Sequence, residues 1–193
     1  SSPEDARRMI EATRALTDRP FNVNVFCHRT PAPDPAGDAA WLRHLAPLYA
    51  RLDMAPPTRL VEVYPSFMDD DRMLDVLLET RPAVVSFHFG LPVPHQLQAL
   101  KKAGICLLAS ATNLDEGRRI EAAGLDAIIA QGIEAGGHRG CFDPKPGVPL
   151  PPDEHLSTAV LVRQLVLNTR LPIIAAGGIM DGHAIRAMKE LGA

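Results

Sequence analysis

Residues 126–140 read Asp-Ala-Ile-Ile-Ala-Gln-Gly-Ile-Glu-Ala-Gly-Gly-His-Arg-Gly, and this stretch decides the fold. Its first five residues form an apolar run that is typical of a buried β-strand. Four glycines then fall within the nine residues 132–140, and glycine lets the backbone approach a ligand closely. His138 lies among them, with the side chain most easily tuned for proton transfer near neutral pH. A glycine loop with a histidine at the end of a strand predicts the chemical site of an α/β protein.

The sequence on both sides of this stretch repeats one pattern. A helix that ends at a glycine and leads into an apolar strand is indicated at 100–105 and at 120–125. Residues 188–193 match the helix end of the same pattern. Such βα units in series predict a parallel sheet with right-handed crossovers. Polar or glycine-rich strand ends favour a TIM (β/α)8 barrel whose ligand lies on that face.

The chain has about five strong strands in this pattern, too few for the eight of a closed barrel. Strands are expected at 21–26, 83–90, 105–110, 126–130 and 172–176. Helices are expected at 3–17, 38–52, 69–80, 94–103, 114–123, 154–169 and 181–191, with a proline-rich loop at 30–38. Both ends of the sequence fall where a neighbouring strand is expected. We therefore predict a single domain, residues 1–193, that is a fragment of a TIM barrel lacking its first and last strands.

The composition indicates an ordinary globular protein. The apolar fraction is 46%, and a net charge of −3 argues against nucleic acid or an anionic membrane as the partner. There is no run long enough to span a bilayer and no signal-peptide pattern. The three cysteines have no metal-ligand spacing, so we expect reduced packing residues, a cytoplasmic protein and no bound metal.

Two asparagines alternate with apolar residues in the first expected strand. Asn22 and Asn24 would therefore point to the same side of the sheet. One interpretation is a polar purpose for that face of a buried strand. The other is an edge strand whose asparagines meet water, and the sequence leaves both open.

The glycine loop supplies most of the candidate site residues. Gln131 and Gly132 lie at a strand tip, where an amide can donate to and accept from a flat heterocycle. Gly136 and Gly137 let the backbone approach the same ring, and His138 can act as an acid or base toward a substrate stacked there.

Other polar residues near this loop have less certain roles. Glu134 is expected to be structural, either as an ion-pair partner of Arg139 or as an anchor for the loop. His88, near the end of its strand, either lines the site or packs beneath it. The remaining histidines are expected at the surface: His28, His44, His95, His155 and His183.

A glycine pair follows the last expected strand. Gly177 and Gly178 end that strand, and a helix begins near Asp181. Backbone N–H groups at such a helix start can bind a phosphate, and barrels often place a phosphate site late in the chain. A tight turn without a ligand is the alternative, but the position one unit after the glycine loop favours phosphate.

Residues 131–140, QGIEAGGHRG, resemble the signature of the nitronate monooxygenase family, formerly called 2-nitropropane dioxygenases. Three further segments are similar in the same order: NVNVF at 22–26, SFHFGLP at 86–92 and AAGGI at 175–179. The resemblance covers essentially the whole chain. The decapeptide is specific to this family and its near relatives, whereas AAGGI is common to many FMN barrels.

The resemblance implies an FMN-bound TIM barrel that oxidises alkyl nitronates with O₂ to a carbonyl compound and nitrite. The resemblance implies that His138 is the catalytic residue and that the nitronate and O₂ are the small-molecule partners. It is also compatible with a homodimer. The residues expected to hold FMN are Asn24, Gln131, Gly132, Gly136, Gly137, Gly177 and Gly178.

Three other interpretations stay open. The FMN-dependent enoyl-acyl-carrier-protein reductases carry a nearly identical glycine–histidine loop, and an NAD(P)H:quinone reductase would belong to the same superfamily. The third interpretation is an inactive, truncated barrel. The family's first strands carry a Gln-Ala-Pro-Met type segment and its last strand carries a Gly-Thr segment, and neither segment has a counterpart in this sequence. The SFHFGLP strand at 86–92 favours nitronate oxidation.

Overall fold

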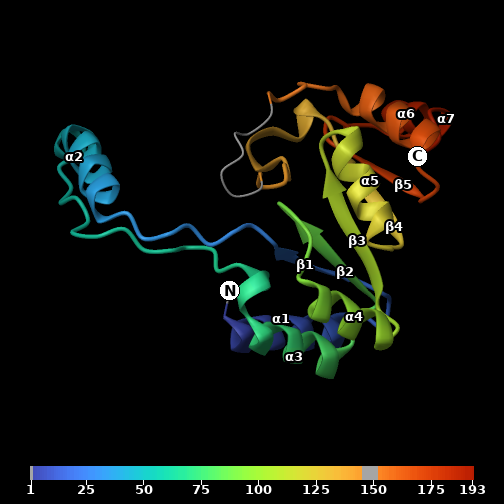
Figure 1. Cartoon of the computed structure of the whole chain (residues 1–193), viewed down its shortest axis with the longest axis horizontal. Helices are drawn as coiled ribbons and strands as arrows, with labels where there is room; N and C mark the ends of the chain where they lie inside the picture. The colour runs from blue at the N-terminus through green and yellow to red at the C-terminus, as the bar shows by residue number, and fades with distance from the viewer. Residues whose placement is uncertain (1, 145–151) are drawn as a thin grey trace. The chain divides into compact units, whose positions relative to one another are not determined.

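A computed structural model describes residues 2–144 and 152–193. Its five strands form one parallel sheet in sequence order (Figure 1). The strands are β1 (Asn22–Phe26), β2 (Val84–His88), β3 (Cys106–Ala111), β4 (Ala127–Gln131) and β5 (Ile173–Ala176). The predicted parallel α/β architecture and its five strands are therefore confirmed.

The helices alternate with the strands as expected from the βα pattern. They are α1 (Pro3–Leu16), α2 (Pro35–Arg51), α3 (Asp71–Thr80), α4 (Pro94–Lys102), α5 (Leu114–Ala122), α6 (Thr158–Asn168) and α7 (Gly182–Glu190). Two 3-10 helices, η1 (Phe67–Asp69) and η2 (Ile133–His138), complete the described elements. In Figure 1, α1, α3 and α4 gather at the β1–β2 side of the sheet, and α5 and α6 lie beside β4.

Capping side chains explain where the structure departs from the expected helix bounds. Helix α2 begins earlier than predicted, at Pro35, because the Asp34 side chain accepts from the N–H of Gly37. Helix α6 begins later, at Thr158, because Ser157 caps it. A side-chain oxygen that satisfies free N–H groups fixes the first turn of a helix.

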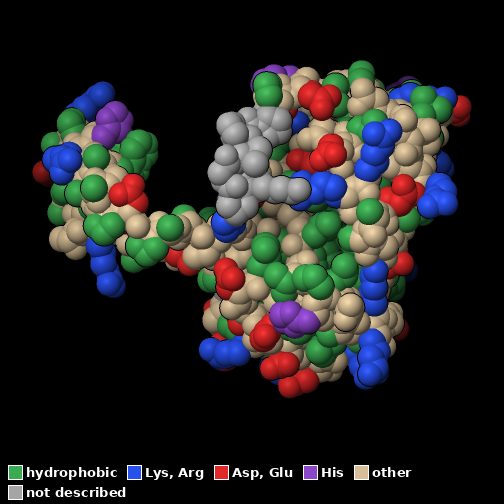
Figure 2. Space-filling model, viewed as in Figure 1, with side chains coloured by type: hydrophobic (Ala, Val, Ile, Leu, Met, Phe, Trp, Pro, Cys, Tyr) green, Lys and Arg blue, Asp and Glu red, His purple; other side chains and the backbone are tan. Residues whose placement is uncertain are grey.

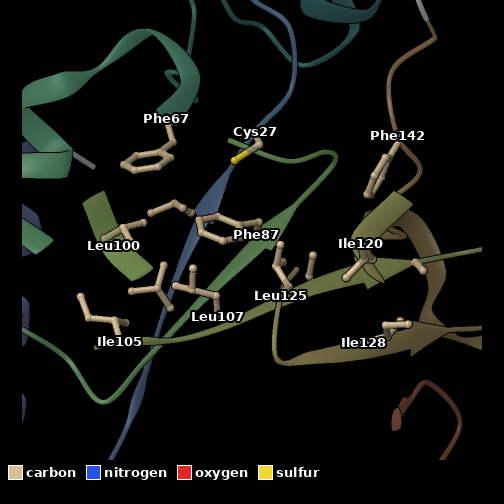
Figure 3. Close-up of a cluster of buried hydrophobic side chains, with 14 of the residues drawn as sticks. Cys27, Phe67, Phe87, Leu100, Ile105, Leu107, Ile120, Leu125, Ile128 and Phe142 are labelled. Carbon is tan, nitrogen blue, oxygen red and sulfur yellow. The ribbon is translucent and has the colours of Figure 1, made fainter. Parts of the chain in front are cut away.

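The core lies between the sheet and its helices (Figure 3). Alternate residues of neighbouring strands face the helices, and Val85, Phe87, Leu107 and Ile128 are all fully buried there. Phe67 stacks on Phe87 with ring centroids 6.2 Å apart. The opposite face of the sheet carries Asn22, Asn24, Ser86 and His88, because successive side chains of a strand point to opposite sides.

The chain divides into two compact units, residues 1–29 with 66–193, and residues 30–65. The smaller unit contains α2. Its apolar side, which helical spacing would bury, is formed by Trp41, Leu42, Leu45, Leu48 and Tyr49. The helix buries none of its residues, and Trp41 and Leu48 are 52% and 50% exposed. Figure 2 shows hydrophobic side chains at its surface. A single domain over residues 1–193 stays a prediction.

The cysteines differ in their surroundings. Cys27 is buried, and burial raises the pKa of its thiol. Cys106 is exposed, on the same face of the sheet as Ser86, so the expectation that the cysteines are packing residues is wrong for this one. None of the described helices is both long and apolar enough to cross a membrane.

The register of the sheet brings the predicted site residues together. Phe26 pairs with His88, and Gln131 pairs with Ala176. The carboxyl ends of all five strands therefore meet at one edge, as parallel pairing requires. The glycine loop follows β4 at this edge, and Gly177 follows β5.

Candidate active site

The loop after β4 forms the centre of the site. Gly132 is extended, and η2 begins at the next residue. Gly136 breaks that helix with φ 78° and ψ −147°, a conformation that side-chain-bearing residues rarely adopt. His138 ends η2 and is exposed. The sequence thus folds so that an imidazole is presented at the surface of the strand-end face, directly after two glycines.

Glu134 anchors the start of this loop. Its carboxylate accepts hydrogen bonds from the N–H and the hydroxyl of Thr158, at 2.8 and 2.9 Å. Thr158 is the first residue of α6, so the carboxylate also meets the positive end of a helix. Arg139 pairs instead with Asp153. Of the two structural roles expected for Glu134, the structure therefore shows the loop anchor.

The pKa of Glu134 lies below its ordinary value. Burial pulls the pKa upward, but hydrogen bonds from its own backbone N–H and from Thr158, together with the charge of Arg139, outweigh that effect. A carboxylate with a lowered pKa stabilises the fold fully above its unfolded-state pKa of 4.5, and this contribution is lost as the pH falls through the lower folded-state value.

We predict that Glu134→Gln lowers the free energy of unfolding by only about 0.5 kcal/mol at pH 7, because Glu134 is exposed and solvent screens its charge. The difference between variant and wild type should shrink as the pH falls from 4.5 through the lower folded-state pKa, because the wild-type carboxylate becomes protonated in the fold over that range. Urea unfolding at pH 7 and at about pH 3.5 measures both values. Glu154→Gln, at another exposed glutamate, is the control, and an equal loss at both pH values would contradict the prediction.

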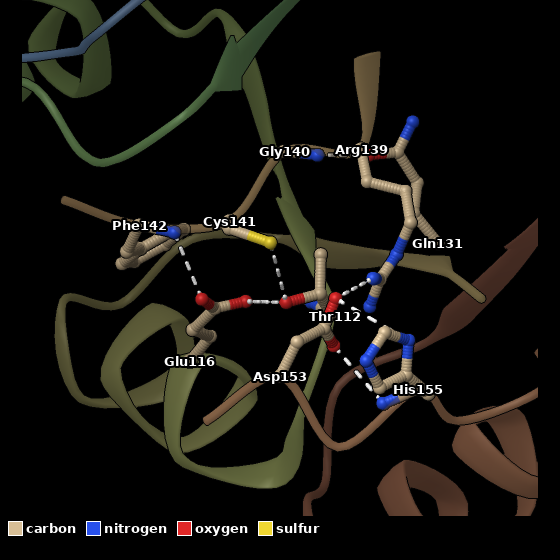
Figure 4. Close-up of polar contacts among 9 residues, drawn as sticks. All are labelled: Thr112, Glu116, Gln131, Arg139, Gly140, Cys141, Phe142, Asp153 and His155. Atoms are coloured by element: carbon tan, nitrogen blue, oxygen red, sulfur yellow. Dashed lines mark hydrogen bonds and ion pairs between the residues drawn. The ribbon is translucent and has the colours of Figure 1, made fainter. Parts of the chain in front are cut away.

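Gln131 closes the loop on itself. Its side-chain oxygen accepts from the N–H of Gly140 at 2.8 Å, and Figure 4 shows the two residues together. The amide oxygen is therefore engaged by protein. A ring placed against this side chain would meet the amide nitrogen, which is a donor.

Glu116 holds the chain that leaves the loop. Its carboxylate accepts from the N–H and hydroxyl of Thr112 at 2.6 and 2.9 Å and from the N–H of Phe142 at 2.8 Å. Figure 4 shows it between these two residues. The side chain is 5% exposed, and the guanidinium of Arg119 lies 4.7 Å from the Phe142 ring centroid. Sequence reasoning missed Glu116, because an acid in the first turn of a helix usually faces solvent.

His88 lies beneath the loop, which resolves its two alternatives. The residue is 8% exposed. Its Nδ1 lies 3.0 Å from the hydroxyl of Ser110, and its Nε2 lies 2.7 Å from the backbone oxygen of His138. Ser110 was also missed, although its place two residues from Leu108 on β3 puts it on the same face of the sheet as His88.

Aromatic rings surround His88. Phe89 lies edge-on to it with ring centroids 4.2 Å apart, and Phe26 lies 5.7 Å away. The Phe89 ring also lies 6.5 Å from that of His138. Phe89 has φ 67°, which strains a bulky residue. Phe89 directly follows β2, so its ring lies near the strand-end face, and hydrophobic periodicity alone gave no signal of its positive φ.

The asparagines of β1 form a polar row with β2. Asn22 donates to the Ser86 hydroxyl at 2.8 Å, and that hydroxyl donates to the Asn24 side-chain oxygen at 2.9 Å. Strand β1 is an edge of the described sheet and both asparagines are exposed. Each interpretation thus has support: the strand is at an edge, and Ser86 orients Asn24 so that its amide nitrogen is available as a donor.

The glycines of the site differ in how much room a side chain would have at each position. A Cβ on Gly136 or Gly137 would meet nothing within 4 Å. A Cβ on Gly132 would lie 2.1 Å from the Thr158 nitrogen, and one on Gly177 would lie 2.7 Å from the Ala135 nitrogen. The first two therefore leave open space beside the loop, whereas the last two are needed for packing within the protein.

The glycine pair after β5 lies against the loop. The positions where Gly177 and Gly178 would carry side chains face Ala135 and Glu134. Both have positive φ, 112° and 71°. Helix α7 begins a few residues later, capped by Asp181, whose side chain accepts from the N–H of Ala184. Within residues 2–144 and 152–193, no group of three or more metal-ligating side chains occurs.

These features define a class of protein. A parallel α/β sheet with a histidine, a glycine loop and a glycine pair at its strand-end face has the architecture of a (β/α)-barrel enzyme. The family model of the nitronate monooxygenases matches residues 1–193, and the chain belongs to this family.

Two bacterial nitronate monooxygenases are similar to the chain over nearly its whole length. The chain is 56% identical to that of Paraburkholderia phytofirmans over 190 residues, which are 98% of this chain and 50% of the relative. It is 52% identical to that of Pseudomonas aeruginosa over 193 residues, which are 100% of this chain and 54% of the relative. The chain therefore spans about half the length of these relatives.

Solved structures agree with this placement. The chain is similar to nitroalkane oxidase from Streptomyces ansochromogenes, with a TM-score of 0.81 and 35% identity over 100% of this chain and 53% of that one. It is less similar to FabK from Thermotoga maritima, with a TM-score of 0.63 and 28% identity over 100% of this chain and 45% of that one.

Proposed function

We propose that the protein oxidises alkyl nitronates with O₂, giving a carbonyl compound and nitrite, and that it uses FMN for this reaction. The observation that carries the proposal is the loop 131–140. It presents His138 at the strand-end face, beside two glycines that leave open space and next to a glycine pair that precedes α7 by a few residues. Membership of the nitronate monooxygenase family supports it.

The residues present fit FMN. The open positions at Gly136 and Gly137 can receive a flat ring. The amide nitrogens of Gln131, at the end of β4, and of Asn24, in the middle of β1, are available as donors. The backbone at Gly177 and Gly178, close before α7, suits a phosphate. Gly132 contributes through its backbone, because its Cβ position is filled by Thr158. When bound, FMN would accept electrons from the nitronate and pass them to O₂.

The chain's own residues orient the substrate and move protons. His138 is exposed at the end of η2, where its imidazole can hold or transfer a proton at the reacting carbon or the nitro group. The Phe89 ring lies beside it and offers an apolar surface for the alkyl part of a nitronate.

We also propose that the protein is cytoplasmic, which is consistent with its free cysteines.

Two glycines with similar positive φ angles test the cofactor site. Gly136 has φ 78° and Gly104 has φ 73°, and a Cβ on either would meet nothing within 4 Å. Alanine strains the backbone at both positions, by about 1–2 kcal/mol at a left-handed φ and by more at Gly136, whose ψ of −147° lies close to a region that is essentially reserved for glycine. We expect Gly136→Ala to weaken FMN binding by about tenfold or more, whereas Gly104→Ala leaves it unchanged. Flavin titration by fluorescence measures this, and equal affinities in the two variants would contradict the site.

The similarity to FabK gives a second candidate, an FMN-dependent enoyl-acyl-carrier-protein reductase. The full-length protein distinguishes the two. Nitrite release from propionate-3-nitronate supports nitronate oxidation, and NADH consumption with a crotonyl thioester supports the reductase. A colourless preparation that binds no added FMN would favour the inactive barrel.

A further inference from the structure

His88 connects three elements of the site through its imidazole. It lies at the end of β2, its Nδ1 is 3.0 Å from the Ser110 hydroxyl of β3, and its Nε2 is 2.7 Å from the backbone oxygen of His138 in η2. A carbonyl oxygen can only accept a hydrogen bond, so Nε2 must carry a proton. In the neutral ring Nδ1 is then the acceptor, and the Ser110 hydroxyl donates to it.

The surroundings of His88 keep this tautomer in place. Burial lowers the pKa of the imidazole, against the opposing effect of its hydrogen bond to the His138 carbonyl. The ring is therefore neutral at pH 7, with one donor and one acceptor, and the two neighbours match that pattern. Such matched partners fix the orientation of a histidine ring.

The loop also packs against the ring. A Cβ on Gly140 would lie 2.7 Å from Cε1 and Nδ1 of His88 and 3.0 Å from Cβ of Ser110. The N–H of Gly140 is held by Gln131 at 2.8 Å. The side chain of His88 thus lies beneath the loop, where it contacts the backbone of His138 and Gly140.

We propose that His88 is a positioning residue: with Ser110, it holds the backbone carbonyl of His138 so that the imidazole of His138 is kept in its working place. The inference rests on the proposed catalytic role of His138. A catalytic group that shifts by even 1 Å can lose about 10²-fold in rate, and the carbonyl that His88 holds belongs to the same residue as the imidazole.

Two substitutions at His88 separate the hydrogen bond from the volume of the ring. In His88→Gln, the side-chain nitrogen can occupy the place of Nε2 and donate to the His138 carbonyl. In His88→Leu, the space is filled but the donor is lost. For the full-length protein loaded with FMN, we expect His88→Leu to lower kcat for nitronate oxidation by about tenfold or more, with KM and flavin content little changed. His88→Gln should recover most of the rate.

The double variant His88→Leu/His138→Ala shows whether His88 acts through His138. The inference predicts that His88→Leu causes no further loss once the His138 imidazole is gone, because effects of residues acting as a unit are not additive. An equal loss in both backgrounds, or full activity of His88→Leu, would overturn it. If His138→Ala alone is fully active, the proposed function fails instead, and the positioning role fails with it.

A milder substitution covers the case in which His88→Leu does not fold. Ser110→Ala removes only the hydroxyl that donates to Nδ1, so the ring keeps its place but loses what fixes its tautomer. We expect a kcat about two- to fivefold below wild type and a ¹⁵N signal of His88 that no longer shows a pure Nε2–H tautomer. An unchanged ¹⁵N signal together with an unchanged kcat would overturn the proposal.

Discussion

His138→Ala is expected to slow nitronate turnover by about 10²- to 10⁴-fold, the contribution of a placed acid or base. The residue is exposed at the end of η2, and its side chain is not needed to hold the loop. Glu134, Gln131 and His88 supply the anchors, and the contact to His88 uses the backbone oxygen of His138. The variant should therefore fold, keep its FMN and lose rate only.

The measurement is kcat for nitrite release, with flavin content determined on the same preparation. His95→Ala is the matched control, because His95 is also exposed and bonds to Asp71 on α3. It should show wild-type turnover. A His138→Ala protein that binds FMN and turns over at the wild-type rate would remove the assigned role.

Glu116→Ala is expected to have the largest effect on stability, a loss of about 3 kcal/mol in the free energy of unfolding. The substitution leaves two backbone N–H groups, of Thr112 and Phe142, without their acceptor in a buried place. Because Phe142 follows the glycine loop by two residues, the same change should loosen the loop and weaken FMN binding.

The control for Glu116 lies one residue away. Asp115 is exposed in the first turn of the same helix, so Asp115→Ala should cost less than about 1 kcal/mol through the helix dipole alone. Urea unfolding of both variants at pH 7 compares them. Similar losses in the two would mean that the buried carboxylate does not clamp the chain after the loop.

The sheet could be predicted because each strand carries its own local signal. Apolar runs indicate all five strands in their order, two of them directly after helices that end at Gly104 and Gly124, and repeated βα units imply parallel pairing. Helix α2 shows the limit of this reasoning. Its apolar spacing predicts a buried side, but burial depends on which element packs against it, and Trp41 is half exposed.

The candidate site was predictable where chemistry and backbone conformation coincide in one segment. The loop 131–140 is recognisable because glycine and histidine occur together in it. The residues that hold this loop are not recognisable from the sequence. Ser110, Glu116 and Thr158 come into contact with the loop and its neighbours only through strand register and helix packing. The positive φ of Phe89 is likewise a tertiary effect that composition does not encode.

The central claim is that this protein oxidises nitronates at the face that carries His138. Its most direct test is nitrite released per O₂ consumed by the full-length protein with propionate-3-nitronate. We predict nitrite production that tracks O₂ uptake in the wild type and falls by about 10²-fold or more in FMN-loaded His138→Ala. An FMN-loaded wild-type protein that releases no nitrite, yet oxidises NADH with a crotonyl thioester, would contradict the claim.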